Sequence, residues 1–236
     1  MNLIATVNPK THKILLTTTP RDYYVPIPGV SDGQRDKLTH AGLYGIDTSI
    51  ATLEELYDID IPFYVRVNFT SVEEIVDVMG GVDVESELAF TTGEEAGAIV
   101  DVKQGKNHFT GKEALAFVRE RKALAEGDNQ RGKNQQALLT GLIRSTMSPK
   151  ILIRANGMIN SVAGNADTNM SEKQMKALIR MQLDTLAGWD IESIAAVGDS
   201  SGKRRCYSYK GGPPYVTVPS ESSVEEIKEK MRHVCQ

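Results

Sequence analysis

The sequence has few cysteines and no long hydrophobic run. Its 236 residues include only Cys206 and Cys235, and no spacing of cysteine and histidine suggests a zinc site. No apolar stretch approaches the ~20 residues that a membrane-spanning helix requires, and no signal peptide opens the chain. These absences favour a globular domain that has no spanning helix of its own.

An excess of positive charge is also missing. The chain has 27 Lys and Arg against 31 Asp and Glu, a net charge of -4, which argues against a general nucleic-acid-binding protein. There is no internal repeat, no GxSxG nucleophile elbow and no Walker loop. The hydrophobic share of 40% is sufficient for a full core, and the length fits one large domain better than two.

The most informative segment runs from Arg119 to Gln135. Arg119 and Arg121 are two residues apart, so in an extended segment their side chains point the same way. Asp128 is a good helix N-cap, and Arg131 and Gln135 follow it at i+3 and i+7 on one helical face. The pattern predicts that three guanidinium groups, one carboxylate and one amide converge at a helix N-terminus.

Such an arrangement suits a diphosphate. A helix N-terminus offers free N–H donors and a positive dipole, and planar Arg side chains match phosphate oxygens two at a time. The alternative is an ordinary amphipathic helix whose arginines are solvated or paired with Glu120, Glu126 and Asp128, because surface ion pairs are common. Both interpretations stay open on this segment alone.

The N-terminal part of the chain contains a second group of polar residues. Leu3 to Val7 and Lys13 to Thr18 read as a β-hairpin that ends at Arg21 and Asp22. An Arg-Asp pair at a strand end is often only a local salt bridge. Residues 23–45 read as a loop, in which Lys37 could contact phosphate, and His40 could orient it, shuttle a proton or be an ordinary surface histidine.

Periodicity along the chain predicts an α/β fold. Strands are expected at residues 61–69, 82–84 and 191–197, and an irregular basic stretch at 198–212. Helices are expected at 47–56, 71–79, 110–118, 130–147, 150–162, 171–186 and 224–234. Asp47 or Thr48 would cap the first of these helices, and capping boxes would begin those at Thr110 and Ser171. The strand, helix and glycine stop between residues 61 and 84 suggest a βαβ unit, in which Arg66 faces solvent or, as the family resemblance described below implies, phosphate. We expect a single domain, residues 1–236, with a mixed central sheet flanked by helices on both faces (three-layer α-β-α) and at least one parallel strand pair.

Several motifs together resemble a known family. They are Arg119-x-Arg121, the Gly127-Asp128 pair with Arg131 and Gln135 behind it, Arg21-Asp22, and Lys37-Leu38-Thr39-His40-Ala41. In this combination the chain resembles the LytR-CpsA-Psr (LCP) family of bacterial cell-wall glycopolymer transferases. The resemblance covers nearly the whole sequence and thins after about residue 165.

The resemblance implies an enzyme that moves wall teichoic acid or capsular polysaccharide from a polyprenyl diphosphate carrier to peptidoglycan. Asp22, Arg21 and Arg121 would be catalytic, and Asp22 would bind Mg²⁺ or act as a base. The diphosphate would be held by Arg119, Arg121, Arg131, Lys37, Arg21 and Gln135. Asp128 and His40 would orient these residues without contacting the diphosphate themselves.

The resemblance also implies a location outside the cell membrane, with a single-pass anchor upstream of Met1. The family's Ser-Asp-Thr segment, whose Asp helps to hold magnesium, is absent from this sequence, so we expect weak metal binding. An exported domain also suits a disulfide between Cys206 and Cys235, although two free thiols are equally compatible with the count. Two further hypotheses are a non-catalytic polyprenyl-phosphate carrier or sensor, and an interaction module whose basic cluster contacts anionic wall polymer.

Overall fold

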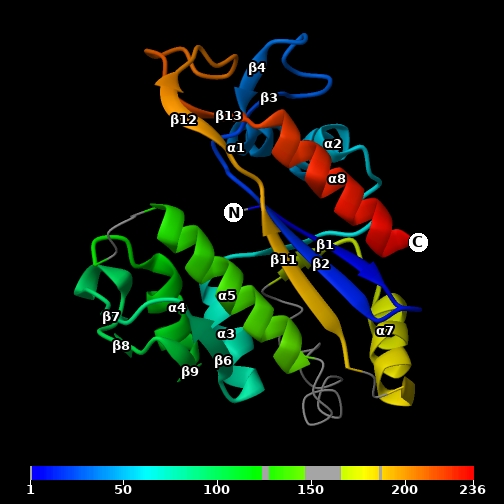
Figure 1. Cartoon of the computed structure of the whole chain (residues 1–236), viewed down its shortest axis with the longest axis vertical. Coiled ribbons are helices and arrows are strands. Elements are labelled where there is room, and N and C mark those ends of the chain that lie inside the picture. The colour runs from blue at the N-terminus through cyan, green and yellow to red at the C-terminus, as the bar shows by residue number, and fades with distance from the viewer. Residues whose placement is uncertain (1, 124–127, 147–165, 186–187) are drawn as a thin grey trace. The chain divides into compact units, whose positions relative to one another are not determined.

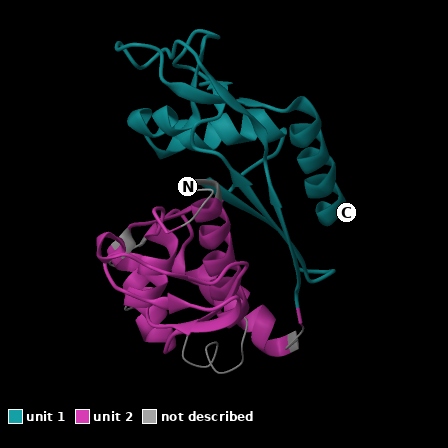
Figure 2. Cartoon of the chain, turned by 60° about the vertical axis from the view of Figure 1, so that its left-hand side comes forward, with its two compact units in different colours: residues 1–62, 189–236 teal, residues 63–188 magenta. Residues whose placement is uncertain are grey.

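The computed structural model describes residues 2–123, 128–146, 166–185 and 188–236. These residues form two compact units (Figure 2): unit 1 contains residues 1–62 and 189–236, and unit 2 contains residues 63–188. Unit 2 is therefore inserted in the sequence between the two parts of unit 1. In the part of the chain described, no helix is both long and apolar enough to cross a membrane.

Unit 1 is built on a mixed three-stranded sheet of β1 (Asn2–Asn8), β2 (Lys13–Thr19) and β11 (Asp190–Ala195) (Figure 1). β1 and β2 form the expected antiparallel hairpin, and the Asn8 side chain accepts hydrogen bonds from two backbone N–H groups in the turn. β11 runs parallel to β2. The prediction of an α/β fold whose sheet includes a parallel pair is confirmed.

Two helices complete the core of unit 1. α8 (Glu221–Cys235), which begins at the N-cap Ser220, packs against β1 and β2, and α2 (Ile46–Tyr57) packs against α8. The buried side chains of this core include Leu15, Tyr23, Leu53, Tyr57, Ile227 and Met231. Their spacing on α8 and α2 is the helical periodicity that the sequence predicts.

The remaining elements of unit 1 are short. They are β3 (Tyr24–Pro26), β4 (Arg35–Lys37), α1 (Leu38–Ala41), the 3₁₀ helix η1 (Gly42–Tyr44), β12 (Gly198–Lys203) and β13 (Tyr215–Pro219). Residues 198–203, expected to be irregular, form a strand antiparallel to β13, with a break in register between Asp199 and Gly202. Such a break hides the period-2 signal that identifies a strand.

Unit 2 packs α3 (Phe69–Met79), α4 (Gly111–Arg119) and α5 (Asp128–Thr146) with the antiparallel pair β6 (Val82–Ser86) and β9 (Gly105–Phe109). Its core includes Val76, Val82, Val84, Phe109, Phe117 and Leu138. The other elements are β5 (Val65–Val67), β7 (Phe90–Thr91), η2 (Glu94–Ala96), β8 (Asp101–Val102), β10 (Ala166–Thr168) and α7 (Glu172–Thr185).

Two local predictions are corrected. The βαβ unit at residues 61–84 is wrong, because β5 pairs antiparallel with β10 and β6 pairs antiparallel with β9. α2 is preceded by Gly45, at a φ of 107°, and has no side-chain cap, so neither Asp47 nor Thr48 caps it. The capping boxes predicted at Thr110 and Ser171 are present. The helix expected at 150–162 lies outside the described residues.

Candidate active site

Three of the predicted site residues meet in unit 1. Nζ of Lys37 lies 2.9 Å from Oδ1 of Asp22, and Nε of Arg21 lies 3.5 Å from Oδ2 of the same carboxylate. The Asp22 side chain is about one-third exposed, while that of Lys37 is mostly buried. The carboxylate is therefore held between two cations, and all three groups lie close enough together to act on one anionic ligand.

The backbone around Asp22 is fixed on both sides. The Asp22 carbonyl accepts a hydrogen bond from the N–H of Thr217 in β13, and the Arg21 carbonyl accepts one from Thr39 in α1. The next residue, Tyr23, is fully buried, and its hydroxyl donates to the carbonyl of Val197 at 2.7 Å. Burial raises the pKa of Tyr23 well above its usual value. These contacts hold Arg21 and Asp22 in a defined position at the end of the hairpin.

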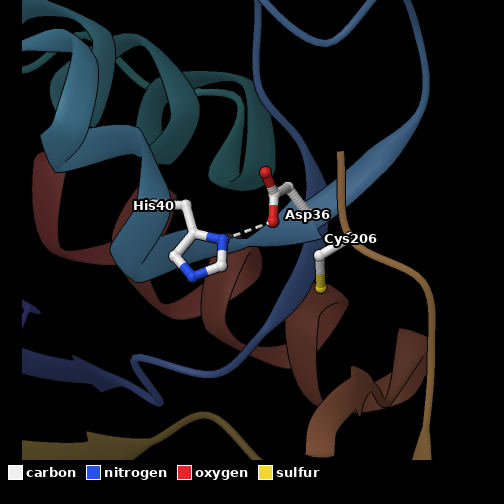
Figure 3. A group of neighbouring side chains, drawn as sticks. All are labelled: Asp36, His40 and Cys206. Carbon is white, nitrogen blue, oxygen red and sulfur yellow. Dashed lines mark hydrogen bonds and ion pairs between the residues drawn. The ribbon is translucent and has the colours of Figure 1, made fainter. Parts of the chain in front are cut away.

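Asp36, next to Lys37, is a fully buried carboxylate with several hydrogen-bond donors around it (Figure 3). Its Oδ1 accepts from Nδ1 of His40 at 2.5 Å and from the N–H of Lys37 at 2.8 Å, and its Oδ2 accepts from the N–H of Ser208 at 2.7 Å. Burial alone would raise the pKa of Asp36, but these hydrogen bonds outweigh burial and lower it. Asp36 thus fixes the backbone of Lys37 and orients His40.

Cys206 completes this cluster and lies next to Asp36 (Figure 3). Asp36, His40 and Cys206 are the one group of three potential metal ligands found among the described residues, with donor atoms within 4.8 Å of one another. Burial, and next the charge of Asp36, raise the pKa of the Cys206 thiol to about 11. The thiol is therefore protonated at neutral pH, and we interpret the cluster as a hydrogen-bonded junction of β4, α1 and the segment after β12.

The predicted Cys206–Cys235 disulfide is wrong. Both cysteines are free, with Cys206 buried and Cys235 exposed at the end of α8. The two cysteines have different neighbours in unit 1: Cys206 lies beside Asp36 and His40, whereas Cys235 follows Val234, whose carbonyl accepts a hydrogen bond from the side chain of Asn8.

In unit 2, Arg119 and Arg121 lie on either side of a buried carboxylate. Glu120 is only 2% exposed and has an extended backbone directly after α4. Its two oxygens accept hydrogen bonds from four backbone N–H groups at 2.6 to 3.0 Å, those of Gly93, Arg121, Lys122 and Ala123. Burial would raise the pKa of Glu120, but the four hydrogen bonds lower it. Glu120 is therefore occupied by the backbone and fixes the segment that carries both arginines.

The helix that carries Arg131 and Gln135 is fixed to the same segment. α5 begins at Asp128, and Arg131 and Gln135 are half-buried residues four apart on it. The buried Asn134 donates to the carbonyl of Phe117 at 3.2 Å, which joins α5 to the last turn of α4 beside Arg119. The side chain of Asp128 lies outside the described part of the structure.

The structure thus holds two groups of predicted site residues, one in each unit. Arg21, Asp22 and Lys37 belong to unit 1, and Arg119, Arg121, Arg131 and Gln135 belong to unit 2. The joint action of the two groups stays a prediction. Arg66 forms an exposed ion pair with Asp167 of β10 at 2.7 Å, which favours the solvent-facing alternative.

A groove of about 590 Å³ in unit 1 is lined by other residues. Its charged side chains are Arg35, Glu55, Arg204, Glu221, Glu225 and Lys228. Three carboxylates balance three cations there, so the groove lacks the excess positive charge that a diphosphate requires.

Sequence reasoning missed the roles of Asp36 and Glu120. The spacing of Asp36 and His40 gave no usable signal, because Asp36 lies on β4 and only His40 lies on α1. No sequence signal identifies Glu120 as buried, since a Glu between two arginines in an exposed segment reads as a surface ion pair.

Comparisons with known proteins agree with the motif pattern. Residues 2–233 match the LytR_cpsA_psr family. A relative from Bacillus cereus (strain AH820), the polyisoprenyl-teichoic acid–peptidoglycan teichoic acid transferase TagU, is 32% identical over 231 residues, which cover 98% of this chain and 71% of the relative.

Solved structures show the same fold. TagV of B. subtilis superposes with a TM-score of 0.79 at 24% identity, covering 98% of this chain and 87% of TagV. The structure of TagT bound to LIIa-WTA gives a TM-score of 0.75 at 28% identity, covering 99% of this chain and 84% of the TagT chain.

Proposed function

The chain belongs to the LytR-CpsA-Psr family, and from this premise we propose that it transfers an anionic glycopolymer from a polyprenyl diphosphate carrier to peptidoglycan. The relatives named as TagU are teichoic acid transferases, so wall teichoic acid is the first candidate for the polymer. The observation that carries the proposal is the carboxylate of Asp22 held between Lys37 and Arg21. A protein that only bound diphosphate would gain nothing from a carboxylate among the cations that hold it.

In the proposed reaction a sugar hydroxyl of peptidoglycan attacks the phosphorus that bears the glycan. A new P–O bond forms to the acceptor, the P–O bond to the lipid phosphate breaks, and polyprenyl phosphate leaves. Arg119, Arg121 and Arg131 bind the diphosphate with paired N–H donors, joined by Lys37 and Arg21. Asp22 either takes the proton of the attacking hydroxyl or holds a magnesium ion.

Support for the arginine side of this mechanism comes from how the arginines are held. Glu120 accepts hydrogen bonds from the N–H groups of Gly93, Arg121, Lys122 and Ala123, which fixes the backbone that follows Arg119. Asn134 joins the helix of Arg131 to α4. Positions fixed before the substrate arrives need no reorganisation during the reaction, which is the main source of electrostatic catalysis.

Magnesium fits the proposed site as a second source of positive charge. Mg²⁺ prefers oxygen ligands and is commonly bound by one or two carboxylates together with substrate phosphates. Asp22 is a partly exposed carboxylate beside two phosphate-binding candidates, so it would hold the ion. When bound, the ion would neutralise charge on the diphosphate.

The partners of the proposed reaction are a polyprenyl diphosphate-linked glycan and peptidoglycan. The reaction would take place at the extracellular face of the bacterial cell membrane, and we propose that the chain acts there.

The test is a transfer assay that supplies the protein with magnesium, lipid-linked teichoic acid and peptidoglycan. We expect polymer to become attached to peptidoglycan with release of one polyprenyl phosphate per transfer. Arg121→Lys keeps the charge but loses the two-pronged geometry, and should lower diphosphate affinity by the ~1.5 to 3 kcal/mol typical of a charged hydrogen bond. Arg144→Lys, at an exposed position further along α5, is the matched control and should be silent.

Diphosphate binding that is unaffected by Arg121→Lys would contradict the proposed role of the arginines. Binding of the lipid without transfer or release of polyprenyl phosphate would instead favour a carrier or sensor.

A further inference from the structure

The segment between β12 and β13 concentrates positive charge in a chain that is negative overall. We define the basic loop as residues 203–215, which contain Lys203, Arg204, Arg205 and Lys210. No Asp or Glu occurs between Ser200 and Ser220, whereas the whole chain has a net charge of -4. All four basic side chains are exposed. The loop lies beside Lys37 of the proposed diphosphate site, because the N–H groups of Ser208 and Lys37 both donate to the carboxylate of Asp36.

Exposed tyrosines accompany these cations. Tyr207, Tyr209 and Tyr215 are 40%, 50% and 63% exposed. The ammonium group of Lys203 lies 4.8 Å from the centre of the Tyr215 ring, a cation–π contact that places a positive charge and an aromatic surface together. Exposed aromatic rings of this kind usually mark a binding surface, because they offer a large apolar face and a polar hydroxyl.

The backbone of the basic loop is fixed although its side chains are exposed. The Tyr24 hydroxyl donates to the carbonyl of Arg205 at 2.7 Å, and the buried carboxylate of Asp36 accepts the N–H of Ser208. The Tyr44 hydroxyl lies 2.9 Å from Oγ of Ser208. Figure 1 shows β12 and the loop that follows it beside β3 and β4, in agreement with these contacts. A surface ordered in advance loses less entropy when it binds a ligand.

Besides the buried Asp36, which accepts from the backbone of Ser208, the acidic neighbours of the loop that we identify lie near Arg204. Asp199 has its pKa lowered mainly by hydrogen bonds from Ser201 and to a smaller extent by the charge of Arg204. Arg204 also lines the groove that contains Glu221 and Glu225. Arg205 and Lys210 are therefore the cations best suited to an external ligand.

We propose that the basic loop binds the glycan chain of the anionic polymer, away from its lipid diphosphate end. Arginine and lysine would contact the repeated phosphodiester groups, while the tyrosine rings pack against the apolar faces of sugar rings. A ligand that carries both groups in alternation fits this mixture of cations and aromatics better than a purely charged or a neutral polymer. The identity of the polymer is inferred from the proposed function. The binding surface is inferred from the exposed cations and tyrosines of the basic loop.

The experiment measures binding of lipid-free wall teichoic acid to the whole chain, with inorganic polyphosphate, neutral dextran and polymer-free peptidoglycan as comparison probes. We expect teichoic acid to bind, and its affinity to fall with rising salt. Arg205→Gln combined with Lys210→Gln should weaken binding roughly tenfold or more. Lys10→Gln combined with Lys13→Gln removes the same charge from exposed positions of unit 1 and should leave binding nearly unchanged.

Tyr209→Ala separates sugar contact from charge, because it should weaken teichoic acid binding and leave polyphosphate binding unchanged. The proposal is overturned if the two double variants bind alike, if polyphosphate binds as tightly as teichoic acid, or if polymer-free peptidoglycan is the preferred ligand. The free polymer lacks the lipid diphosphate and no transfer is measured. Failure here therefore leaves the transfer assay unaffected, and failure of transfer leaves this measurement valid.

Discussion

Nζ of Lys37 lies 2.9 Å from Oδ1 of Asp22, although Asp22 lies in a turn and Lys37 on β4, 15 positions apart. The ammonium group reaches Asp22 because the backbone of Lys37 is fixed by Asp36 on one side and by α1 on the other. The pair places one positive and one negative group at the same point of unit 1. Each can then serve a different atom of a phosphoryl-transfer reaction.

Replacing Lys37 tests the positive member of this pair. Lys37→Met keeps much of the apolar stem but removes the ammonium group, so the affinity for polyprenyl diphosphate should fall by ~1.5 to 3 kcal/mol, or roughly 10- to 100-fold. Titration calorimetry or a fluorescent lipid diphosphate measures the change. Lys10→Met removes a charge from an exposed turn of the same unit and is the control. Equal affinities of the two variants would exclude Lys37 from the diphosphate site.

Glu120 should be important for stability. Glu120→Gln places an amide where a carboxylate now accepts four N–H groups, and the amide NH₂ would face donors such as the N–H of Gly93. We expect a loss of ~1 to 3 kcal/mol in the free energy of unfolding at neutral pH. Denaturant unfolding measures it. Glu94→Gln, an exposed position in the same unit, should change stability little.

The effect of Glu120 should depend on pH in a defined direction. The pKa of Glu120 is lower in the folded chain than its usual value of 4.5, so its contribution is present above that value and is lost as pH falls through the folded pKa. The difference in Tm between the wild-type chain and Glu120→Gln should therefore be largest near pH 7 and shrink below about pH 4.5. A difference that grows on acidification would contradict this account.

The two cysteines should differ in reactivity. Cys235 is exposed, whereas Cys206 is buried and its pKa is raised to about 11, so thiolate is scarce at Cys206. A thiol reagent at pH 8 should label one thiol per folded chain and two after unfolding without reductant. Cys235→Ser should abolish the fast reaction. If no thiol reacts in the unfolded, unreduced chain, Cys206 and Cys235 must instead form a disulfide.

Two glycines of α5 should respond oppositely to alanine. A Cβ on Gly141 would lie 2.3 Å from the Asp83 carbonyl oxygen, so Gly141→Ala must push α5 away from β6. We expect a destabilisation of ~1 to 3 kcal/mol, as for other overpacked cores. A Cβ on Gly132 meets nothing within 4 Å, and Gly132→Ala should stabilise the chain by up to ~1 kcal/mol through helix propensity. Thermal unfolding measures the change in stability of both variants. If both substitutions destabilise the chain, the contact with β6 is not the cause.

The sequence predicted what depends on neighbouring residues. The hairpin of β1 and β2, the capping boxes at Thr110 and Ser171 and the start of α5 at Asp128 all follow from signals within a few positions. Strand pairing was harder, because β5 pairs with β10 about 100 residues away and nothing local distinguishes that partner from β6. The βαβ prediction failed for this reason.

The residues of the candidate site also divide into those that sequence motifs identify and those that only the structure reveals. Arg21, Asp22 and Lys37 were predicted from motifs, and the structure brings them together. Asp36 and Glu120 were missed as structural residues because burial of a carboxylate depends on donors from distant segments, Ser208 for Asp36 and Gly93 for Glu120. Composition could not reveal those contacts.

The central claim, that Asp22 makes this chain a transferase, is tested most directly by Asp22→Asn, with Asp32→Asn at an exposed position as the control. Turnover and lipid binding are measured on the same samples. Loss of the carboxylate should lower turnover on the order of 10²-fold or more, while affinity for polyprenyl diphosphate, measured without magnesium, stays equal or rises because a negative charge is gone. Wild-type turnover in Asp22→Asn would contradict the account.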